Sequence, residues 1–247
     1  MIKDGVNKTE QDIVSFLMIG QSNMAGRGEL DDVPPIANPN LYMLRMGRWQ
    51  ILSEPVNTDR AVTKGDFHSG VSLGASFGDE HQRHFNIKTG MIPCADGGTA
   101  ISQWMPGEIL FDHAVFMTRL AMRTSRLGGI IWHQGESDCN KTDVGLYKER
   151  FITMISEMRR QLNAPDIPVI IGELSTDTDP TRWGHGAYVG QMNRVFYDIA
   201  KSLPQCAVAS AKGITIKPDG LHFDAKGSRE FGKRYFEKYL EVIQKEG

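Results

Sequence analysis

The strongest constraint on the fold is the alternation of short apolar runs with longer amphipathic segments along the chain. The apolar runs expected to form strands lie at residues 13–19, 91–95, 130–132, 169–171 and 206–209. Runs of this length and composition are typical of buried strands. Because segments of more than ten residues with helical spacing separate most of them, the sequence predicts a parallel sheet covered by helices on both faces.

The helices are predicted from the spacing of apolar residues. They are expected at residues 72–85, 112–127, 144–162 and 188–203, with a last helix that begins at an Asp224 N-cap. In the second of these, Phe116, Leu120 and Ala121 are expected to face the core, and the pair Gly128-Gly129 to end the helix. Two short strands are expected at 41–44 and 49–52, around a Met46-Gly47 turn. The chain shows no repeat or linker, so residues 1–247 are expected to form one domain.

A serine follows the first predicted strand directly, within Gly20-Gln21-Ser22-Asn23-Met24. This position places the Ser22 hydroxyl at the carboxyl edge of the sheet, where open α/β sheets bind their ligands. The stretch differs from the G-x-S-x-G elbow, because Met24 occupies the position of the second glycine. Taken alone, Ser22 could equally be a helix N-cap.

A second polar stretch, Asp219-Gly220-Leu221-His222, lies near the end of the chain. Histidine can accept the proton of a serine hydroxyl and return it to a leaving alcohol. A carboxylate on the other ring nitrogen fixes the tautomer of the histidine. Ser22, His222 and Asp219 are therefore the candidate nucleophile, base and orienting carboxylate. For an isolated Asp-x-x-His, a turn with a surface histidine would be the simpler interpretation.

Four sequence blocks together resemble those of the SGNH hydrolases. They are residues 20–24, Gly97-Gly98-Thr99-Ala100-Ile101 with Trp104, residues 132–137 and residues 219–222. Their order is similar to that of the sialate O-acetylesterases and the family 6 carbohydrate esterases, which include acetylxylan esterases. The resemblance implies a three-layer α/β/α sandwich of flavodoxin-like topology. It also implies an acetylated carbohydrate substrate, such as a xylan fragment or sialic acid, and no cofactor.

The resemblance assigns further residues to the site. The oxyanion donors would be the Ser22 amide, an amide of the Gly97-Gly98 turn, with Gly97 preferred, and the side chain of Gln134. Gln134 stands where most of the superfamily has asparagine, and glutamine is characteristic of this branch.

The remaining candidates are assigned to substrate binding or to support of the site. They are Gln21, Trp104, His133 and Glu136. For Glu136 a buttressing hydrogen bond is favoured over a general-base role. For Trp104, stacking on a sugar and filling the core are equally compatible with the sequence.

Composition limits the partners and the compartment. The formal net charge of −2 and the absence of a basic run exclude nucleic acid and anionic membrane as main partners. Residues 1–12 are polar and lack the apolar core of a signal peptide, which leads us to expect a cytoplasmic protein. The three cysteines have no metal-binding spacing, and Cys94 and Cys206 are expected to be buried. Cys139 follows Glu136 closely enough to lie near the site, without a role as nucleophile.

Three other functions are compatible with parts of the sequence. The same fold could act on other acyl esters as a lipase or thioesterase, and faster hydrolysis of long-chain esters would indicate this. A zinc-dependent deacetylase could be built on four histidines, His68, His81, His84 and His113, although a solvent-exposed helix face better explains the His81-x-x-His84 spacing. A non-catalytic carbohydrate-binding protein would not need Ser22, Asp219 and His222 together. The sequence leaves the identity of the sugar and the oligomeric state open.

Overall fold

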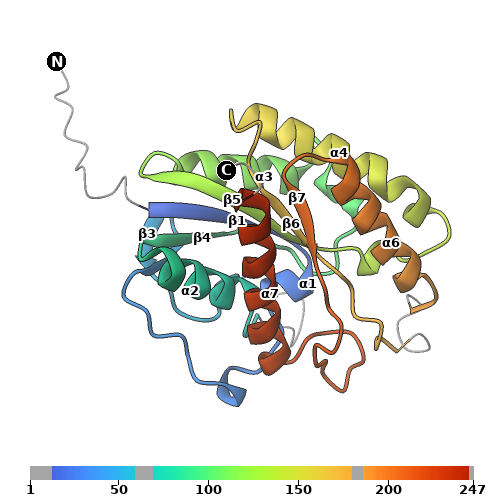
Figure 1. Ribbon diagram of the computed structural model, residues 1–247, viewed down its shortest axis with the longest axis horizontal. Coiled ribbons are helices and arrows are strands. Elements are labelled where there is room, and N and C mark those ends of the chain that lie inside the picture. Colours follow the sequence, from blue (N-terminus) through green and yellow to red (C-terminus); the bar gives the residue numbers. More distant parts are fainter. Residues whose placement is uncertain (1–12, 59–68, 180–185, 245–247) are drawn as a thin grey trace.

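The chain forms one seven-stranded sheet with helices on both faces (Figure 1). The computed structural model describes residues 13–58, 69–179 and 186–244. Within these, the strands are β1 Ile13–Gly20, β2 Leu41–Arg45, β3 Arg48–Ile51, β4 Thr89–Pro93, β5 Ser125–His133, β6 Val169–Gly172 and β7 Cys206–Ala209. The strand order is β3-β2-β4-β1-β5-β6-β7. All neighbouring strands are parallel except β2 and β3.

The flavodoxin-like topology is confirmed. Strands β4-β1-β5-β6-β7 follow the order 2-1-3-4-5 when they are counted along the chain, and the β2–β3 hairpin extends the sheet beyond β4. In this topology the strand order reverses around β1. The loops that follow β1 and its neighbours therefore meet at the carboxyl edge, at the switch point where such sheets bind ligands.

Helices form the two outer layers of the sandwich. The helices are α1 Ser22–Ala25, α2 Leu73–Phe85, α3 Ile109–Ala121, α4 Asp143–Gln161, α6 Gly186–Ser202 and α7 Ala225–Ile243. Helices α2 and α7 cover one face, and α3, α4 and α6 cover the other (Figure 1). Strand β1 is buried on both sides: Phe16 and Met18 pack toward α2 and α7, whereas Leu17 and Ile19 pack toward the opposite layer.

One antiparallel pair, β2 and β3, lies at the edge of the otherwise parallel sheet. The turn between β2 and β3 consists of Met46 and Gly47, with φ values of 51° and 74°. Two residues with positive φ form the type of turn that joins antiparallel strands, and a parallel connection needs a much longer segment. The two short strands were predicted, and their direction follows from the turn.

The boundary between α3 and β5 differs from the prediction. Helix α3 ends at Ala121, and Phe116 is 63% exposed instead of facing the core. Gly128 and Gly129 lie inside β5 and do not end the helix. A Cβ on Gly128 would overlap with the Val14 side chain, so this glycine allows the close approach of β1 to β5.

The other predicted helices are confirmed. Strand β4 is also present, but it begins and ends two residues before its predicted range. In α4, the apolar residues at helical spacing are buried; they are Tyr147, Phe151, Met154, Ile155 and Met158, followed by Leu162. In α7, Phe231, Tyr235, Tyr239 and Val242 are buried. The carboxylate of Asp224 accepts hydrogen bonds from the Gly227 amide at 2.6 Å and the Thr215 hydroxyl at 2.7 Å, as an N-cap does.

Replacing Asp224 with alanine is expected to destabilise the protein by about 1 kcal/mol, because the first turn of α7 loses its cap. Urea denaturation followed by circular dichroism measures the change. Asp224→Asn keeps an oxygen acceptor and is the matched control. Equal destabilisation by both substitutions would contradict a capping role.

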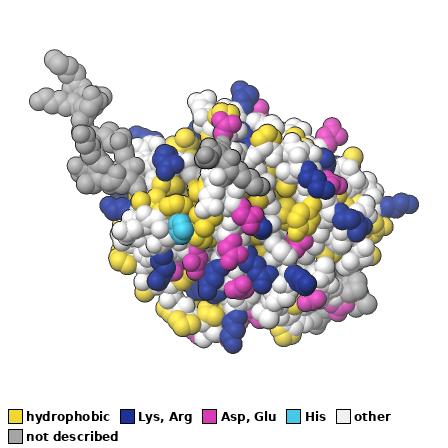
Figure 2. Space-filling model, viewed as in Figure 1, with side chains coloured by type: hydrophobic (Ala, Val, Ile, Leu, Met, Phe, Trp, Pro, Cys, Tyr) yellow, Lys and Arg dark blue, Asp and Glu magenta, His cyan; other side chains and the backbone are white. Residues whose placement is uncertain are grey.

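The surface carries both signs of charge, and Lys or Arg side chains alternate with Asp or Glu side chains on the face shown in Figure 2. Across the described part of the chain, no helix combines the length and apolar character needed to cross a bilayer. Cys94 and Cys139 are buried as free thiols. Cys206 is only half-buried, which corrects the expectation that it lies in the core.

Candidate active site

The end of β1 carries Ser22 at the carboxyl edge of the sheet. The Gln21 amide donates to the His133 carbonyl at 2.9 Å, which ties the end of β1 to the end of β5. Gly20 has a φ of 135°, and a Cβ there would overlap with the same carbonyl. Only glycine fits this approach. The chain then turns into α1, whose first residue is Ser22.

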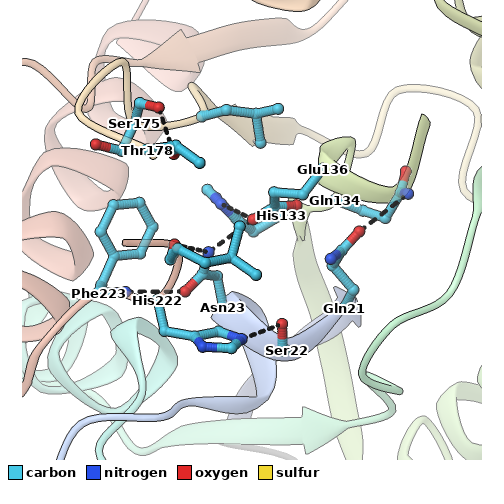
Figure 3. A network of polar contacts seen from close by, with 12 residues as sticks. Gln21, Ser22, Asn23, His133, Gln134, Glu136, Ser175, Thr178, His222 and Phe223 are labelled. Atoms are coloured by element: carbon cyan, nitrogen blue, oxygen red, sulfur yellow. Dashed lines mark hydrogen bonds and ion pairs between the residues drawn. The ribbon is translucent and has the colours of Figure 1, made fainter. Parts of the chain in front are cut away.

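Ser22, His222 and Asp219 form a continuous hydrogen-bond chain. The Ser22 Oγ lies 3.0 Å from His222 Nε2, and His222 Nδ1 lies 2.8 Å from Asp219 Oδ2 (Figure 3 shows the first of these contacts). Ser22 and His222 are 200 positions apart in the sequence, and the loop before α7 brings them together. The geometry is that required of a nucleophile, its base and an orienting carboxylate.

The Asp219 carboxylate also organises its own loop. Its Oδ1 accepts the amides of Leu221 at 2.9 Å and His222 at 3.0 Å, which leaves Oδ2 directed at the imidazole. Burial alone would raise the pKa of Asp219, but the hydrogen bonds from the His222 backbone and ring and from the Leu221 amide lower it below its usual value. Asp219 is therefore ionised at neutral pH and aligned with His222.

Asn23 connects the serine turn to the histidine loop. Its Oδ1 accepts the Phe223 amide at 3.0 Å, and its Nδ2 donates to the Leu221 carbonyl at 3.3 Å (Figure 3 shows the former). One side chain thus holds the residues on both sides of His222. The Nδ2 also donates to Glu136 Oε1 at 2.6 Å.

The loop after β4 presents Gly97 toward this edge. The Asp96 amide donates to the Gly20 carbonyl at 2.9 Å, so the loop is tied to the end of β1. Gly97 is buried, whereas Gly98 is exposed with a φ of 75°. Because Ser22 is the first residue of α1, its amide has no partner within that helix. Donation from Ser22 and Gly97 to an oxyanion stays a prediction.

Gln134 does not fit the oxyanion role expected for it. Its side chain is fully buried, and Nε2 donates to the Thr99 carbonyl at 2.9 Å and to Asp138 Oδ2 at 2.6 Å. The Tyr147 hydroxyl donates to Gln134 Oε1 at 2.8 Å. Because both amide hydrogens are used inside the protein, Gln134 fixes the loop that carries Gly97 instead of facing the substrate.

The four residues assigned to binding or support are all buried and hydrogen-bonded within the protein. Trp104 is 0% exposed, donates to Thr99 Oγ1 at 3.0 Å and belongs to the core, so it does not stack on a sugar. Gln21 Oε1 lies 3.2 Å from Gln134 Nε2. His133 and Glu136 contact each other, with His133 Nε2 3.4 Å from Glu136 Oε1. These residues support the site.

Glu136 is ionised in this environment. Burial raises its pKa, but the adjacent His133 and the hydrogen bond from Asn23 outweigh burial and lower the pKa below its usual value. A buried carboxylate with these partners is a structural acceptor, which agrees with the favoured buttressing role.

Three of the histidines considered as zinc ligands lie in the described residues: His81, His84 and His113. His81 is buried instead of lying on a solvent-exposed face, and its Nδ1 lies 2.8 Å from Thr89 Oγ1. Burial, then the charges of Arg126 and His84, lower the pKa of His81 to about 3. His113 is exposed on α3, and His68 lies outside the described residues. In the ranges that the structure covers, no group of three or more His, Cys, Asp or Glu residues is placed to hold a metal ion.

Two residues that support the site, Asn23 and Tyr235, are not among the candidates predicted from the sequence. Asn23 stands inside the serine block, and an amide that offers both a donor and an acceptor is suited to bridge two loops. The presence of this amide next to Ser22 could have indicated its role from the sequence. Tyr235 gave no such indication, because it occupies an ordinary core position on an amphipathic helix.

Comparison with known proteins places this geometry in a family. A probable carbohydrate esterase of Arabidopsis thaliana is 28% identical over 245 residues, which cover 91% of this chain and 89% of that protein. A crystal structure of an Arabidopsis thaliana protein superposes with a TM-score of 0.82 at 26% identity and covers 94% of this chain and 98% of that chain. The structure of NanS superposes with a TM-score of 0.76 at 17% identity, over 95% of this chain and 99% of that one.

The fold is that of the SGNH hydrolases, a class that includes carboxylic ester hydrolases. Residues 12–241 match the carbohydrate esterase family described as sialic acid-specific acetylesterases. The chain belongs to this family of carbohydrate acetylesterases.

Proposed function

We propose that this protein is a serine esterase that removes O-acetyl groups from acetylated sugars, with xylan-derived oligosaccharides and sialic acid as the leading substrates. The observation that carries the proposal is the hydrogen-bond chain from Ser22 through His222 to Asp219. Membership of an acetylesterase family supports the acetyl group and the carbohydrate.

In the proposed reaction, Ser22 Oγ attacks the acetyl carbonyl carbon while His222 Nε2 takes the hydroxyl proton. The carbonyl oxygen becomes an oxyanion, which the amides of Ser22 and Gly97 would stabilise. When the intermediate collapses, the bond to the sugar oxygen breaks and His222 returns the proton to that oxygen. The sugar alcohol leaves, and Ser22 carries the acetyl group.

Hydrolysis of the acetyl-enzyme repeats these steps with water as the nucleophile. His222 takes a proton from the water, and acetate leaves when the proton returns to Ser22 Oγ. Asp219 orients the imidazole and stabilises its charged form in both halves of the reaction.

The acyl preference tests the proposed class of substrate. Because the chain belongs to a family of carbohydrate acetylesterases, a small acyl group is expected to react best. We expect 4-nitrophenyl acetate to be hydrolysed faster than the octanoate ester, and acetate to be released from acetylated xylo-oligosaccharides or O-acetylated sialic acid. The comparison of kcat/KM values between these two sugars then selects the substrate. Preference for octanoate would indicate a lipase or thioesterase instead.

A further inference from the structure

A chain of buried polar groups runs behind the site, from α7 to the loop of His222. The Tyr235 hydroxyl lies 2.8 Å from the Trp132 carbonyl oxygen and 3.0 Å from His133 Nδ1. On the other side of the ring, His133 Nε2 lies 3.4 Å from Glu136 Oε1, and Asn23 Nδ2 lies 2.6 Å from the same oxygen. Figure 3 shows His133, Glu136 and Asn23 grouped beside the Ser22–His222 pair.

The position of each hydrogen in this series of hydrogen bonds can be assigned by starting from the Trp132 carbonyl. The Trp132 carbonyl only accepts, so the single hydroxyl hydrogen of Tyr235 must be donated to it. The Tyr235 oxygen then accepts, and His133 Nδ1 must carry the donated hydrogen. If His133 were neutral, its Nε2 lone pair would face the ionised Glu136 carboxylate, and two acceptors would oppose each other. A hydrogen on Nε2 removes this repulsion, and the short 2.6 Å contact from Asn23 Nδ2 to Glu136 Oε1 is typical of a donor on an ionised carboxylate, which favours a hydrogen on His133 over one on Glu136.

We propose that His133 carries a proton on both ring nitrogens and forms a buried ion pair with Glu136, and that Tyr235 is a positioning residue that holds this pair under the His222 loop. The protonation state stands on the contacts alone, whereas the positioning role rests on the proposed function.

The surroundings of His133 fit a fixed, charged ring. The titratable groups that contact it are Tyr235 on α7 and Glu136 in the loop after β5. Phe223 and Phe231 meet the ring edge to face, with centroids 5.3 Å and 5.5 Å away. Burial and then the charge of Glu136 raise the pKa of Tyr235 well above its usual value, which keeps its hydroxyl a donor.

The backbone of β6 leaves space for this contact. A Cβ on Gly172 would overlap with the Tyr235 hydroxyl and would also crowd His133 Nδ1. A larger residue at this position would therefore break the link between Tyr235 and His133. Glycine at the end of β6 thus serves the hydrogen-bond chain directly.

Asn23 transmits the position of Glu136 to the base. Its Nδ2 is shared between Glu136 Oε1 and the Leu221 carbonyl, and its Oδ1 accepts the Phe223 amide. A shift of the Glu136 carboxylate would move Asn23 and with it both neighbours of His222. Small displacements of a catalytic group have large effects on turnover.

Tyr235→Phe removes only the hydroxyl and tests the positioning role. We expect kcat for 4-nitrophenyl acetate to fall by about 10- to 100-fold, and KM to change by less than about twofold, because the base is displaced while the binding surface stays intact. Tyr239→Phe is the matched control. Tyr239 lies one turn later on α7, is buried, and makes no hydroxyl hydrogen bond within the described residues. Equal kcat values for the two variants would overturn the positioning role.

Nitrogen-15 NMR of the histidine-labelled protein tests the ion pair without reference to activity. We expect both His133 nitrogens to show one-bond coupling to hydrogen at pH 7, with the resonances assigned from His133→Gln. An Nε2 without hydrogen would overturn the ion pair. If wild-type and Ser22→Ala proteins hydrolyse the ester equally, the proposed function fails, and the NMR result still decides the protonation state of His133.

Discussion

Ser22→Ala is expected to lower kcat for acetyl ester hydrolysis by a factor on the order of 10⁴–10⁶, because loss of the nucleophile leaves only binding and oxyanion stabilisation. The substitution removes one oxygen whose described partner is His222 Nε2, so the fold should be retained. Release of 4-nitrophenol from its acetate measures the loss. Mass spectrometry of rapidly quenched wild-type protein should find the added acetyl group on the peptide that contains Ser22.

The matched control is Ser202→Ala. Ser202 is exposed at the end of α6, where its hydroxyl bonds to the Asp198 carbonyl and to Lys148. We expect this variant to keep the wild-type rate. Unchanged hydrolysis by Ser22→Ala, with a circular dichroism spectrum identical to that of the wild type, would rule out the serine mechanism.

Asp219→Asn is expected to lower kcat by about 10⁴-fold while the fold is preserved. The direction of the effect follows from the loop geometry. The oxygen that accepts the amides of Leu221 and His222 must remain an oxygen, so the new NH₂ group is forced to face His222 Nδ1. The imidazole then carries its hydrogen on Nε2 and donates to Ser22 instead of accepting its proton.

Steady-state kinetics of Asp219→Asn beside Asp198→Asn checks this prediction. Asp198 is exposed on α6 and forms an ion pair with Lys201, so its amide variant should retain the wild-type rate. A kcat for Asp219→Asn within tenfold of the wild type would show that another group orients His222.

The sequence predicts those site residues whose roles follow from their neighbours along the chain. It does not predict roles that depend on contacts with residues distant in the sequence. Ser22 follows a buried strand, and His222 follows Asp219 at a spacing that allows one loop to hold both, so neither inference required the three-dimensional arrangement. Gln134 was predicted to be an oxyanion donor because the sequence does not show that Thr99 and Asp138 accept its amide hydrogens in the folded protein. A glutamine whose amide hydrogens are bound inside the protein cannot be distinguished in the sequence from one whose amide is free to bind a ligand.

The same distinction applies to the fold. Long amphipathic segments such as α4 show their period directly, whereas Gly128 can be read either as a helix stop or as a close contact between strands. The contact with Val14 decides between these, and it joins residues more than a hundred positions apart. For the same reason, the exposure of Phe116 could not be inferred before the bounds of α3 were known.

The proposed nucleophile and its base are far apart in the sequence. Ser22 emerges early, but the hydrogen bonds that complete its surroundings span 198 to 200 positions and reach the loop that immediately precedes α7. A nascent or truncated chain without that loop would possess the serine and the sheet edge and still lack a proton acceptor. On the proposed mechanism, ester hydrolysis therefore requires that the loop before α7 has folded against α1, so activity reports the formation of these long-range contacts.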